Sequence, residues 1–227
     1  MQAAGRRVSL AAVLLDLDGT LVDTAPDLVA VLNRLLRESG RPRMPYAVAR
    51  NEVSNGASGL LRLGLGRHAA ADEVERLRPR FLEIYAAHIA EGSRLFIGID
   101  NLDDIGSRFS LGVVTNKPDA FTKPLLAALD LSPRIASVVS GDRLPQRKPD
   151  PAPLKLAATE LGLPPARCVY VGDAPRDIEA GRAAGMATIA AAYGYIRPSD
   201  DPYGWGADAV IRRPSDLAGA LESLRSV

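Results

Sequence analysis

The sequence is poor in the residues that build cross-links, membrane spans and nucleic-acid surfaces. Its 227 residues include one cysteine, Cys168, which excludes a disulfide framework and a cysteine-based zinc cluster. We expect this thiol to act as a small buried apolar group. No apolar run approaches the roughly 18 residues that a membrane helix needs. The formal net charge is +1, which leaves no global field to hold a nucleic-acid backbone. We therefore expect a soluble protein with neither membrane nor nucleic-acid partners.

Lysine is also scarce. Of the 28 basic residues only four are lysines, namely Lys117, Lys123, Lys148 and Lys155. Any chemistry that needs a lysine must use one of these positions. Arg6 and Arg7 precede an apolar run from Val8 to Leu15, but this run is short and has no small-residue cleavage pattern behind it. We expect it to be a first strand in a cytoplasmic protein.

Short apolar runs recur along the chain, each ending in a polar or small residue. They cover residues 11–15, 111–114, 138–139 and 169–171, with weaker runs at 188–192 and 209–211. Continuous runs of this kind suit strands that are buried on both faces. Between them, Pro153–Leu161 and Pro175–Ala184 carry proline in the first turn and glycine just past the end, as helices do. The alternation predicts a doubly wound, parallel, Rossmann-like α/β sheet.

The stretch after the first strand breaks this alternation. Pro26–Ser39 has the apolar spacing of an amphipathic helix and ends before Gly40, and a helical pattern over Asp72–Glu91 is interrupted by Pro79. The stretch is too long for a simple crossover. We expect a helical domain inserted at residues 22–94, and the alternative is a helical decoration of the sheet. The α/β core would then comprise residues 1–21 and 95–227.

The most specific pattern follows the first expected strand. Residues 16–22 read Asp-Leu-Asp-Gly-Thr-Leu-Val, so Asp16 and Asp18 precede a glycine that permits a tight turn. Two carboxylates so close at a strand end make a compact acidic site. An isolated aspartate pair in a loop is often only a turn or a helix cap, so its meaning depends on the other motifs.

Three further motifs follow. Thr115 ends a predicted strand, and with the backbone N–H of Asn116 it can hold a phosphate oxygen. Lys148 precedes a proline-rich helix start and offers a point charge for a phosphate or carboxylate, although an isolated lysine is usually a solvated surface group. Asp173 ends another strand and Asp177 lies one helical turn further on, so both can face one metal ion. Alone, Asp173 would equally suit a helix N-cap. In a parallel sheet these strand ends meet at one edge, where ligands bind.

Taken together and in this order, the four motifs resemble those of the haloacid dehalogenase superfamily of phosphatases. The likeness covers nearly the whole chain. The closer resemblance is to the phosphoglycolate phosphatase-like subfamily, in segments 23–28, 55–57, 115–118 and 148–154. Within it, segments 93–96, 176–182, 194–198 and 205–208 are similar to bacterial N-acetylmuramic acid 6-phosphate phosphatases. Two positions depart from the pattern of many relatives. Ala174 stands where they carry serine or aspartate, and Ile97 stands where they carry proline. Neither change removes a charged position.

The resemblance implies a helical cap domain and a phosphatase mechanism. Asp16 would be the nucleophile and would form an aspartyl-phosphate. Asp18 would protonate the leaving alkoxide and then accept a proton from water. Lys148 would neutralise Asp16 and the phosphoryl oxygens, while Thr115 and Asn116 would hold the transferring group.

A carboxylate that approaches a phosphate dianion meets strong repulsion in a poorly screened site, so a hard cation is expected. The resemblance implies Mg²⁺ as this cation. Its ligands would be Asp16, Asp173 and the main-chain carbonyl of Asp18, with Asp177 ligating or orienting from behind.

Specificity is expected on the cap. Arg50, Ser54 and Asn55 lie in a polar, glycine-containing stretch that could face the leaving group. Arg50 is the candidate for holding a substrate carboxylate, and the alternative is a surface arginine. The expected partner is a small phosphate monoester such as 2-phosphoglycolate or N-acetylmuramic acid 6-phosphate, both of which carry a carboxylate.

Two other functions share these motifs. One is a phosphosugar mutase, which uses the same pair of aspartates but excludes water differently. The other is a non-catalytic phosphate-binding regulator. Schiff-base chemistry from the cap is excluded because no lysine precedes Lys117. The composition fits either a monomer or a dimer.

Overall fold

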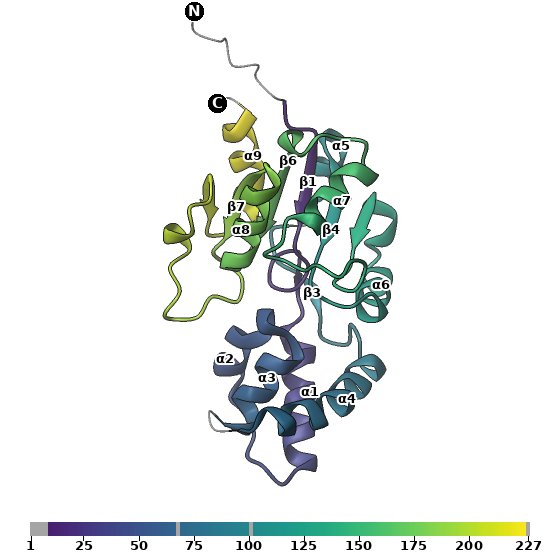
Figure 1. Ribbon diagram of the computed structural model, residues 1–227, viewed down its shortest axis with the longest axis vertical. Coiled ribbons are helices and arrows are strands. Elements are labelled where there is room, and N and C mark those ends of the chain that lie inside the picture. Colours follow the sequence, from purple (N-terminus) through teal and green to yellow (C-terminus); the bar gives the residue numbers. More distant parts are fainter. Residues whose placement is uncertain (1–8, 67–68, 100–101, 226–227) are drawn as a thin grey trace, which may run out of the picture.

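The parallel sheet that the sequence predicts is present. The computed structural model describes residues 9–66, 69–99 and 102–225, so Arg6 and Arg7 lie outside the described residues. Six strands, all paired in parallel, form one sheet in the order β5-β4-β1-β6-β7-β8 (Figure 1). They are β1 (Ala12–Leu15), β4 (Ser110–Val114), β5 (Ser137–Val139), β6 (Cys168–Gly172), β7 (Ala187–Ala191) and β8 (Ala209–Ile211). Strand β1 therefore lies between β4 and β6, which places three motif-bearing strands side by side.

Both faces of the sheet are covered, and this explains the continuous apolar runs. In β1, Val13 and Leu15 belong to one buried cluster, whereas Ala12 and Leu14 belong to another. Helices α5 (Leu102–Arg108), α6 (Asp119–Ala128) and α9 (Leu217–Arg225) contribute to the first cluster. Helices α7 (Ala152–Glu160) and α8 (Pro175–Ala184) contribute to the second. A strand buried on both faces has no polar side to alternate with, and the doubly wound α/β fold is confirmed.

Short turns of 3-10 helix complete this part of the chain. They are η2 (Ser132–Arg134), η3 (Pro165–Arg167), η4 (Pro202–Trp205) and η5 (Pro214–Asp216). Cys168, at the start of β6, is fully buried as expected. None of the helices in the described part of the chain combines the length and hydrophobicity needed to span a lipid bilayer.

The stretch after the first strand folds into a separate group of helices, at the opposite end of the molecule from α9 (Figure 1). They are α1 (Ala25–Glu38), α2 (Tyr46–Ala49), the 3-10 helix η1 (Arg50–Asn55), α3 (Gly56–Leu65) and α4 (Ala71–Ala87). Their apolar side chains form a third buried cluster, distinct from the two beside the sheet. The amphipathic helix predicted over Pro26–Ser39 corresponds to α1.

Two details differ from the sequence-based expectation. Helix α4 continues through Pro79 instead of breaking there. Proline removes the hydrogen bond to the carbonyl four residues earlier, and here both Pro79 and Glu75 are exposed, so water can satisfy that carbonyl. The second difference is helix α3, which was not predicted because it contains glycines that disfavour helix formation. Gly64 allows close packing, because a Cβ there would lie 2.9 Å from a Leu32 methyl on α1.

The chain passes between the two groups of elements through a small antiparallel ribbon. Strand β2 (Val22–Asp23) pairs with β3 (Arg94–Leu95), Val22 opposite Leu95. We propose the division given above on this basis, with residues 22–94 as the cap and residues 1–21 and 95–227 as the core. The names cap and core are used in this sense below.

Candidate active site

The carboxyl ends of three neighbouring strands bring the motif residues together. Asp16 follows β1, Thr115 follows β4 and Asp173 follows β6. The register pairs Leu15 with both Val113 and Val171, so these ends lie level with one another. Residues far apart in the sequence therefore share one edge of the sheet.

Three buried carboxylates lie at this edge. Asp16, Asp173 and Asp177 are at most 4% exposed, and each offers an oxygen within 4.8 Å of the others. Asp177 is held from its own helix start, where its Oδ2 accepts the Ala174 N–H at 3.0 Å. Burial, followed by the charges of Asp177 and Asp16, raises the pKa of Asp173 to about 7.

A single buried lysine balances part of this charge. Lys148 Nζ lies 2.9 Å from Asp16 Oδ1 and 2.8 Å from Asp177 Oδ1. It also donates to Tyr170 Oη at 2.7 Å and to the Val114 carbonyl at 3.1 Å. Burial acts to lower the pKa of Lys148, but the charges of Asp16 and Asp177 outweigh it and the pKa is raised. Lys148 is thus a fixed positive charge beside Asp16.

The Asn116 side chain positions Lys148 by binding the Lys148 backbone. The Asn116 side chain donates to the Lys148 carbonyl and accepts the Lys148 N–H, both at 3.1 Å. The Thr115 hydroxyl accepts the N–H of Lys117 at 3.2 Å, so its own O–H remains to donate to a ligand. The amide of Asn116 therefore ties the Thr115 loop to the Lys148 loop.

The Asp18 side chain has different partners from the other aspartates. Its Oδ1 accepts from Thr24 Oγ1 at 2.6 Å and lies 2.8 Å from Lys117 Nζ. Among the described residues, the group of carboxylates close enough to share a metal ion does not include it. The Asp18 side chain therefore lies outside the group of three carboxylates that could hold a metal ion, and it pairs with Lys117 instead.

Lys117 is a site residue that the motifs did not single out. Its side chain is 7% exposed, and its Nζ lies 4.7 Å from the centre of the Tyr85 ring on α4 of the cap. Burial acts to lower the pKa of Lys117, whereas Asp18 and Tyr85 raise it, and the net shift is upward. The available signal was its place after Thr115-Asn116 in a chain with four lysines.

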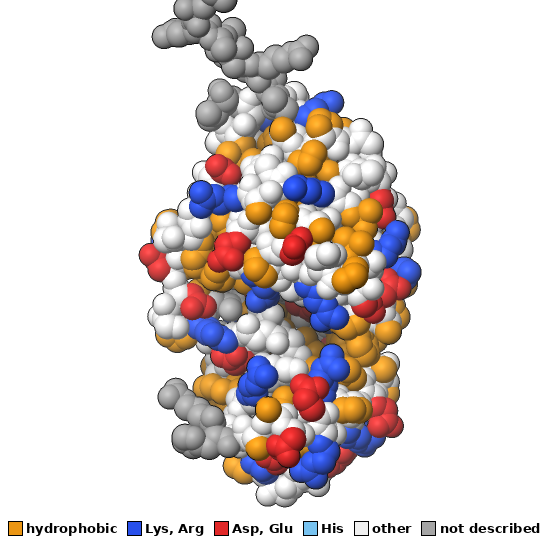
Figure 2. Space-filling view, viewed as in Figure 1, with side chains coloured by type: hydrophobic (Ala, Val, Ile, Leu, Met, Phe, Trp, Pro, Cys, Tyr) orange, Lys and Arg blue, Asp and Glu red, His pale blue; other side chains and the backbone are white. Residues whose placement is uncertain are grey.

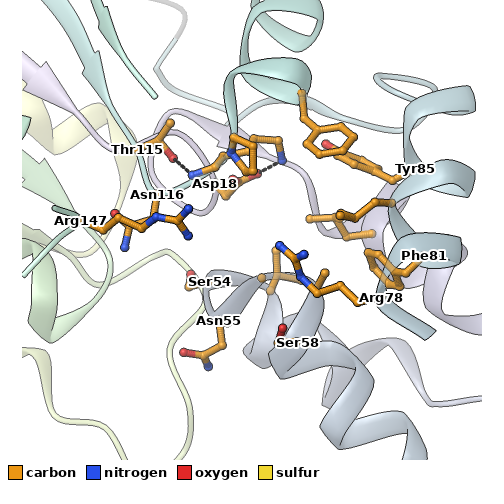
Figure 3. Close-up of a pocket in the computed structure, with 18 of the residues that line it drawn as sticks. Asp18, Ser54, Asn55, Ser58, Arg78, Phe81, Tyr85, Thr115, Asn116 and Arg147 are labelled. Atoms are coloured by element: carbon orange, nitrogen blue, oxygen red, sulfur yellow. Dashed lines mark hydrogen bonds and ion pairs between the residues drawn. The ribbon is translucent and has the colours of Figure 1, made fainter. Parts of the chain in front are cut away.

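A cleft of about 340 Å³ separates these residues from the cap. Asp16, Asp18 and Thr115 line the core side, and Figure 3 shows the last two. The cap side combines apolar side chains with the polar Ser54, Asn55 and Ser58, the apolar ones being Leu28, Val53, Ala57, Phe81, Leu82 and Tyr85. Two arginines, Arg78 from the cap and Arg147 from the core, reach into the cleft from opposite sides (Figure 3).

Of the expected cap residues, Ser54 and Asn55 reach the cleft. Ser54 Oγ donates to Asp173 Oδ2 at 2.8 Å, and the Ser54 carbonyl accepts from the Arg176 guanidinium at 2.6 Å. Ser54 therefore links the cap directly to the buried carboxylates. Asn55 is exposed and donates to Glu52 at 3.0 Å.

Arg50 does not line this cleft. Its guanidinium donates to the carbonyls of Gly194 and Tyr193 at 3.0 and 3.3 Å, and lies 4.9 Å from the centre of the Tyr195 ring. Hydrogen bonds to backbone carbonyls and an aromatic face already occupy it. In the structure Arg50 links the cap to the core through these contacts.

Tyr195 lies in segment 194–198 of the resemblance, but the four motifs gave it no role. Its hydroxyl accepts the N–H groups of Thr24 and Ala25 at 2.7 and 2.9 Å and donates to Asp23 Oδ1 at 2.8 Å. Its own N–H donates to Asp173 Oδ2 at 2.9 Å. One residue thus fixes both the start of the cap and an aspartate of the buried cluster.

Known proteins resemble this chain along almost its full length. The sequence pattern of the haloacid dehalogenase-like hydrolase family matches residues 13–191. The chain is 42% identical over 219 residues to the N-acetylmuramic acid 6-phosphate phosphatase of Pseudomonas aeruginosa, covering 96% of this chain and 97% of that protein. It is 42% identical over 210 residues to a phosphoglycolate phosphatase of Xanthomonas campestris pv. campestris, covering 91% and 94%. The crystal structure of a predicted phosphoglycolate phosphatase from Haemophilus somnus 129PT superposes with a TM-score of 0.82 at 26% identity, covering 96% and 99%.

These comparisons agree with the parallel sheet and its flanking helices. They also confirm the resemblance inferred from the four motifs. The chain belongs to the haloacid dehalogenase-like hydrolase family and is a phosphomonoesterase of its phosphoglycolate phosphatase-like group.

Proposed function

We propose that this enzyme is a Mg²⁺-dependent phosphatase that acts through an aspartyl-phosphate on Asp16. Its substrate would be a small, carboxylate-bearing phosphate monoester of the N-acetylmuramic acid 6-phosphate or 2-phosphoglycolate type. The observation that carries the proposal is the buried group of Asp16, Asp173 and Asp177, two of which, Asp16 and Asp177, pair with Lys148. A cytoplasmic location remains a prediction from the sequence.

The carboxylates fit a magnesium ion. Their oxygens lie within 4.8 Å of one another, and the buried Oδ1 of Asp173 has no hydrogen-bond partner among the described residues. Carboxylate and carbonyl oxygens are the ligands that Mg²⁺ takes. Asp16, Asp173 and Asp177, with the main-chain carbonyl of Asp18, would hold the ion. When bound, it would offset the repulsion between Asp16 and a phosphate dianion.

The hydrogen bonds of Asp16 support its role as the nucleophile. Its Oδ1 accepts the Leu17 N–H at 2.7 Å and lies beside Lys148, which leaves Oδ2 for the substrate. An oxygen of Asp16 attacks phosphorus, and the bond between phosphorus and the leaving oxygen breaks. Lys148 and the Thr115 hydroxyl stabilise the negative charge on the phosphoryl oxygens. The product of this step is an aspartyl-phosphate at Asp16.

Asp18 moves the protons. It gives one proton to the leaving alkoxide, which departs as an alcohol. Water then attacks the aspartyl-phosphate at phosphorus, the bond to Asp16 breaks, and Asp18 takes the proton of the water. The ion pair with Lys117 at 2.8 Å and the hydrogen bond from Thr24 hold the Asp18 carboxylate in place for both proton transfers.

The test is phosphate release from a panel of monoesters, first with Mg²⁺ and then with excess EDTA. We expect release from N-acetylmuramic acid 6-phosphate, from 2-phosphoglycolate or from both, and its loss with EDTA. Activity that persists without divalent cations would contradict the metal site. Activity on a generic aryl phosphate alone would retain the chemistry and remove the substrate assignment.

A further inference from the structure

Two arginines in the cleft have no side-chain partner within residues 9–66, 69–99 and 102–225. Arg78 is half-buried on α4 of the cap, and Arg147 is exposed on the core loop that precedes Lys148. Neither guanidinium makes a hydrogen bond or ion pair with any residue that the structure describes, although both line the cleft. Figure 3 shows the two side chains pointing toward one another across it. Figure 2 shows basic side chains on both sides of the hollow between cap and core.

The other cations at the site already have partners. Lys148 pairs with Asp16 and Asp177, Lys117 pairs with Asp18, and the Arg176 guanidinium donates to the Ser54 carbonyl. Those groups balance the charges of the reacting centre. The positive charge of Arg78 and Arg147 is surplus, which suits a second anionic group on the substrate. Guanidinium groups bind carboxylates in paired hydrogen bonds.

The position of Arg78 on its helix indicates the size of the leaving group. Arg78, Phe81, Leu82 and Tyr85 line the cleft at helical spacing, so they share one face of α4. Tyr85 stands at the catalytic end, against the ion pair of Lys117 and Asp18. Seven residues separate it from Arg78, which is about 10 Å along the helix axis. A carboxylate that binds at this outer end of the helix face suits a leaving group longer than two carbons.

The buried part of this helix face carries a further unsatisfied group. Tyr85 is 2% exposed, and its hydroxyl has no hydrogen-bond partner among the described residues. A hydroxyl left unpaired in a buried position is costly, and a polar group of the leaving group would satisfy it. Between Tyr85 and Arg78, the apolar surface of Phe81 and Leu82 suits the carbon skeleton of a sugar.

We propose that Arg78 and Arg147 jointly bind a carboxylate at the far end of a sugar-sized leaving group. This inference rests on the proposed function and deepens it, because it selects the phosphosugar acid over the two-carbon phosphoglycolate. One arginine comes from the cap and the other from the core. The bound carboxylate therefore bridges the two and holds the cap against the reacting centre.

The experiment compares two sugar phosphates that differ in the carboxylate. N-acetylglucosamine 6-phosphate has the same phosphate and acetamido groups as N-acetylmuramic acid 6-phosphate but lacks its carboxylate-bearing ether. The ratio of kcat/KM for the two substrates is measured for the wild type, Arg78→Gln, Arg147→Gln and the control Arg76→Gln. Arg76 lies on the same helix with its side chain 74% exposed, so its loss removes a charge but no contact with the cleft.

We expect the wild type to prefer the carboxylate-bearing sugar. Arg78→Gln and Arg147→Gln should each lower that preference by about 10- to 100-fold, as expected for a lost charged hydrogen bond. The loss should fall mainly on KM, and Arg76→Gln should keep the wild-type ratio. If Arg78→Gln or Arg147→Gln kept the wild-type preference, this inference would be overturned and the proposed function would stand. Faster turnover of 2-phosphoglycolate than of either sugar would also overturn it and leave the proposed function standing. No Mg²⁺-dependent release from any of the three would overturn both.

Discussion

The two walls of the cleft are built in different ways. On the core wall, Asp16 follows the end of β1 and is paired with Lys148, which is buried behind it and donates to the Val114 carbonyl at the end of β4. On the cap wall, Phe81 and Leu82 present apolar surface, and Arg78 has no partner among the described residues. On the core wall, the charged and polar side chains are paired with other groups of the protein. The exceptions are carboxylate oxygens that suit a cation. The cap wall is completed only by something that enters the cleft.

This contrast separates reaction from recognition. Buried, mutually balanced charges in a low-dielectric site are costly to rearrange, so the core wall suits one chemical step and tolerates little change. Substitutions on an apolar wall with one unpaired cation leave no buried charge without its partner. We therefore expect substitutions on the core wall to affect turnover of every phosphate ester. Those on the cap wall should affect which ester is used.

The largest expected effect is that of Asp16→Asn. An amide oxygen is a poor nucleophile, so turnover should fall by about 10⁴-fold or more for all substrates. Phosphate release measured over hours at high enzyme concentration gives the size of the loss. Thermal unfolding serves as the control that the variant is folded. Turnover within tenfold of the wild type would show that Asp16 is not the nucleophile.

Asp18→Asn should come next, with a fall of about 10²- to 10⁴-fold in kcat, the range attributed to general acid–base catalysis. Because the Asp18 side chain lies outside the group of three carboxylates that could hold a metal ion, the Mg²⁺ concentration needed for half-maximal activity should stay near that of the wild type. Titration of Mg²⁺ against phosphate release measures both quantities. Normal turnover would remove Asp18 from the mechanism.

Asp173→Ala tests the metal site within the core wall. Removing one of three clustered carboxylates should raise the Mg²⁺ concentration needed for half-maximal activity at least about tenfold, by analogy with changes around metal ligands. Isothermal calorimetry with Mg²⁺ alone gives a readout that does not depend on turnover. Unaltered Mg²⁺ affinity would refute the assignment of this cluster as the metal site.

Ser54→Ala makes the smallest change and tests the boundary between the walls. It removes the one cap hydroxyl that donates to Asp173, a hydrogen bond of about 1 kcal/mol, which corresponds to roughly fivefold in kcat/KM. Steady-state kinetics on both sugar phosphates should show the same small loss for each. A loss in kcat as large as that of Asp18→Asn would break the comparison, because a cap residue would then take part in the chemistry.

The core wall could largely be predicted from the sequence, and the physical reason is the parallel sheet. A continuous apolar run that ends in Asp16, Thr115 or Asp173 places each side chain at the same edge once the strands pair in parallel. The motifs gave Lys117 no role, because its role comes from a contact with Asp18, 99 residues away in the sequence. The spacing of residues along the chain does not indicate a pair so far apart.

The cap wall was predicted less well, for reasons that also lie in its physics. Helix α3 holds glycines that mask its helical pattern, and their use is close packing on α1. Arg50 and Arg78 are both arginines of the cap, but backbone carbonyls near Tyr195 occupy the first. Only tertiary packing decides which of them faces the cleft.

The central claim is that the core wall carries out phosphoryl transfer to Asp16, and chemical trapping tests it most directly. Wild-type protein with Mg²⁺ and N-acetylmuramic acid 6-phosphate is quenched during turnover and treated with borohydride, which reduces an acyl phosphate to an alcohol. Peptide mass spectrometry then locates the reduced residue. The account predicts homoserine at position 16 and nowhere else, and none without substrate. Steady turnover with an unmodified Asp16, or reduction at a different carboxylate, would contradict it.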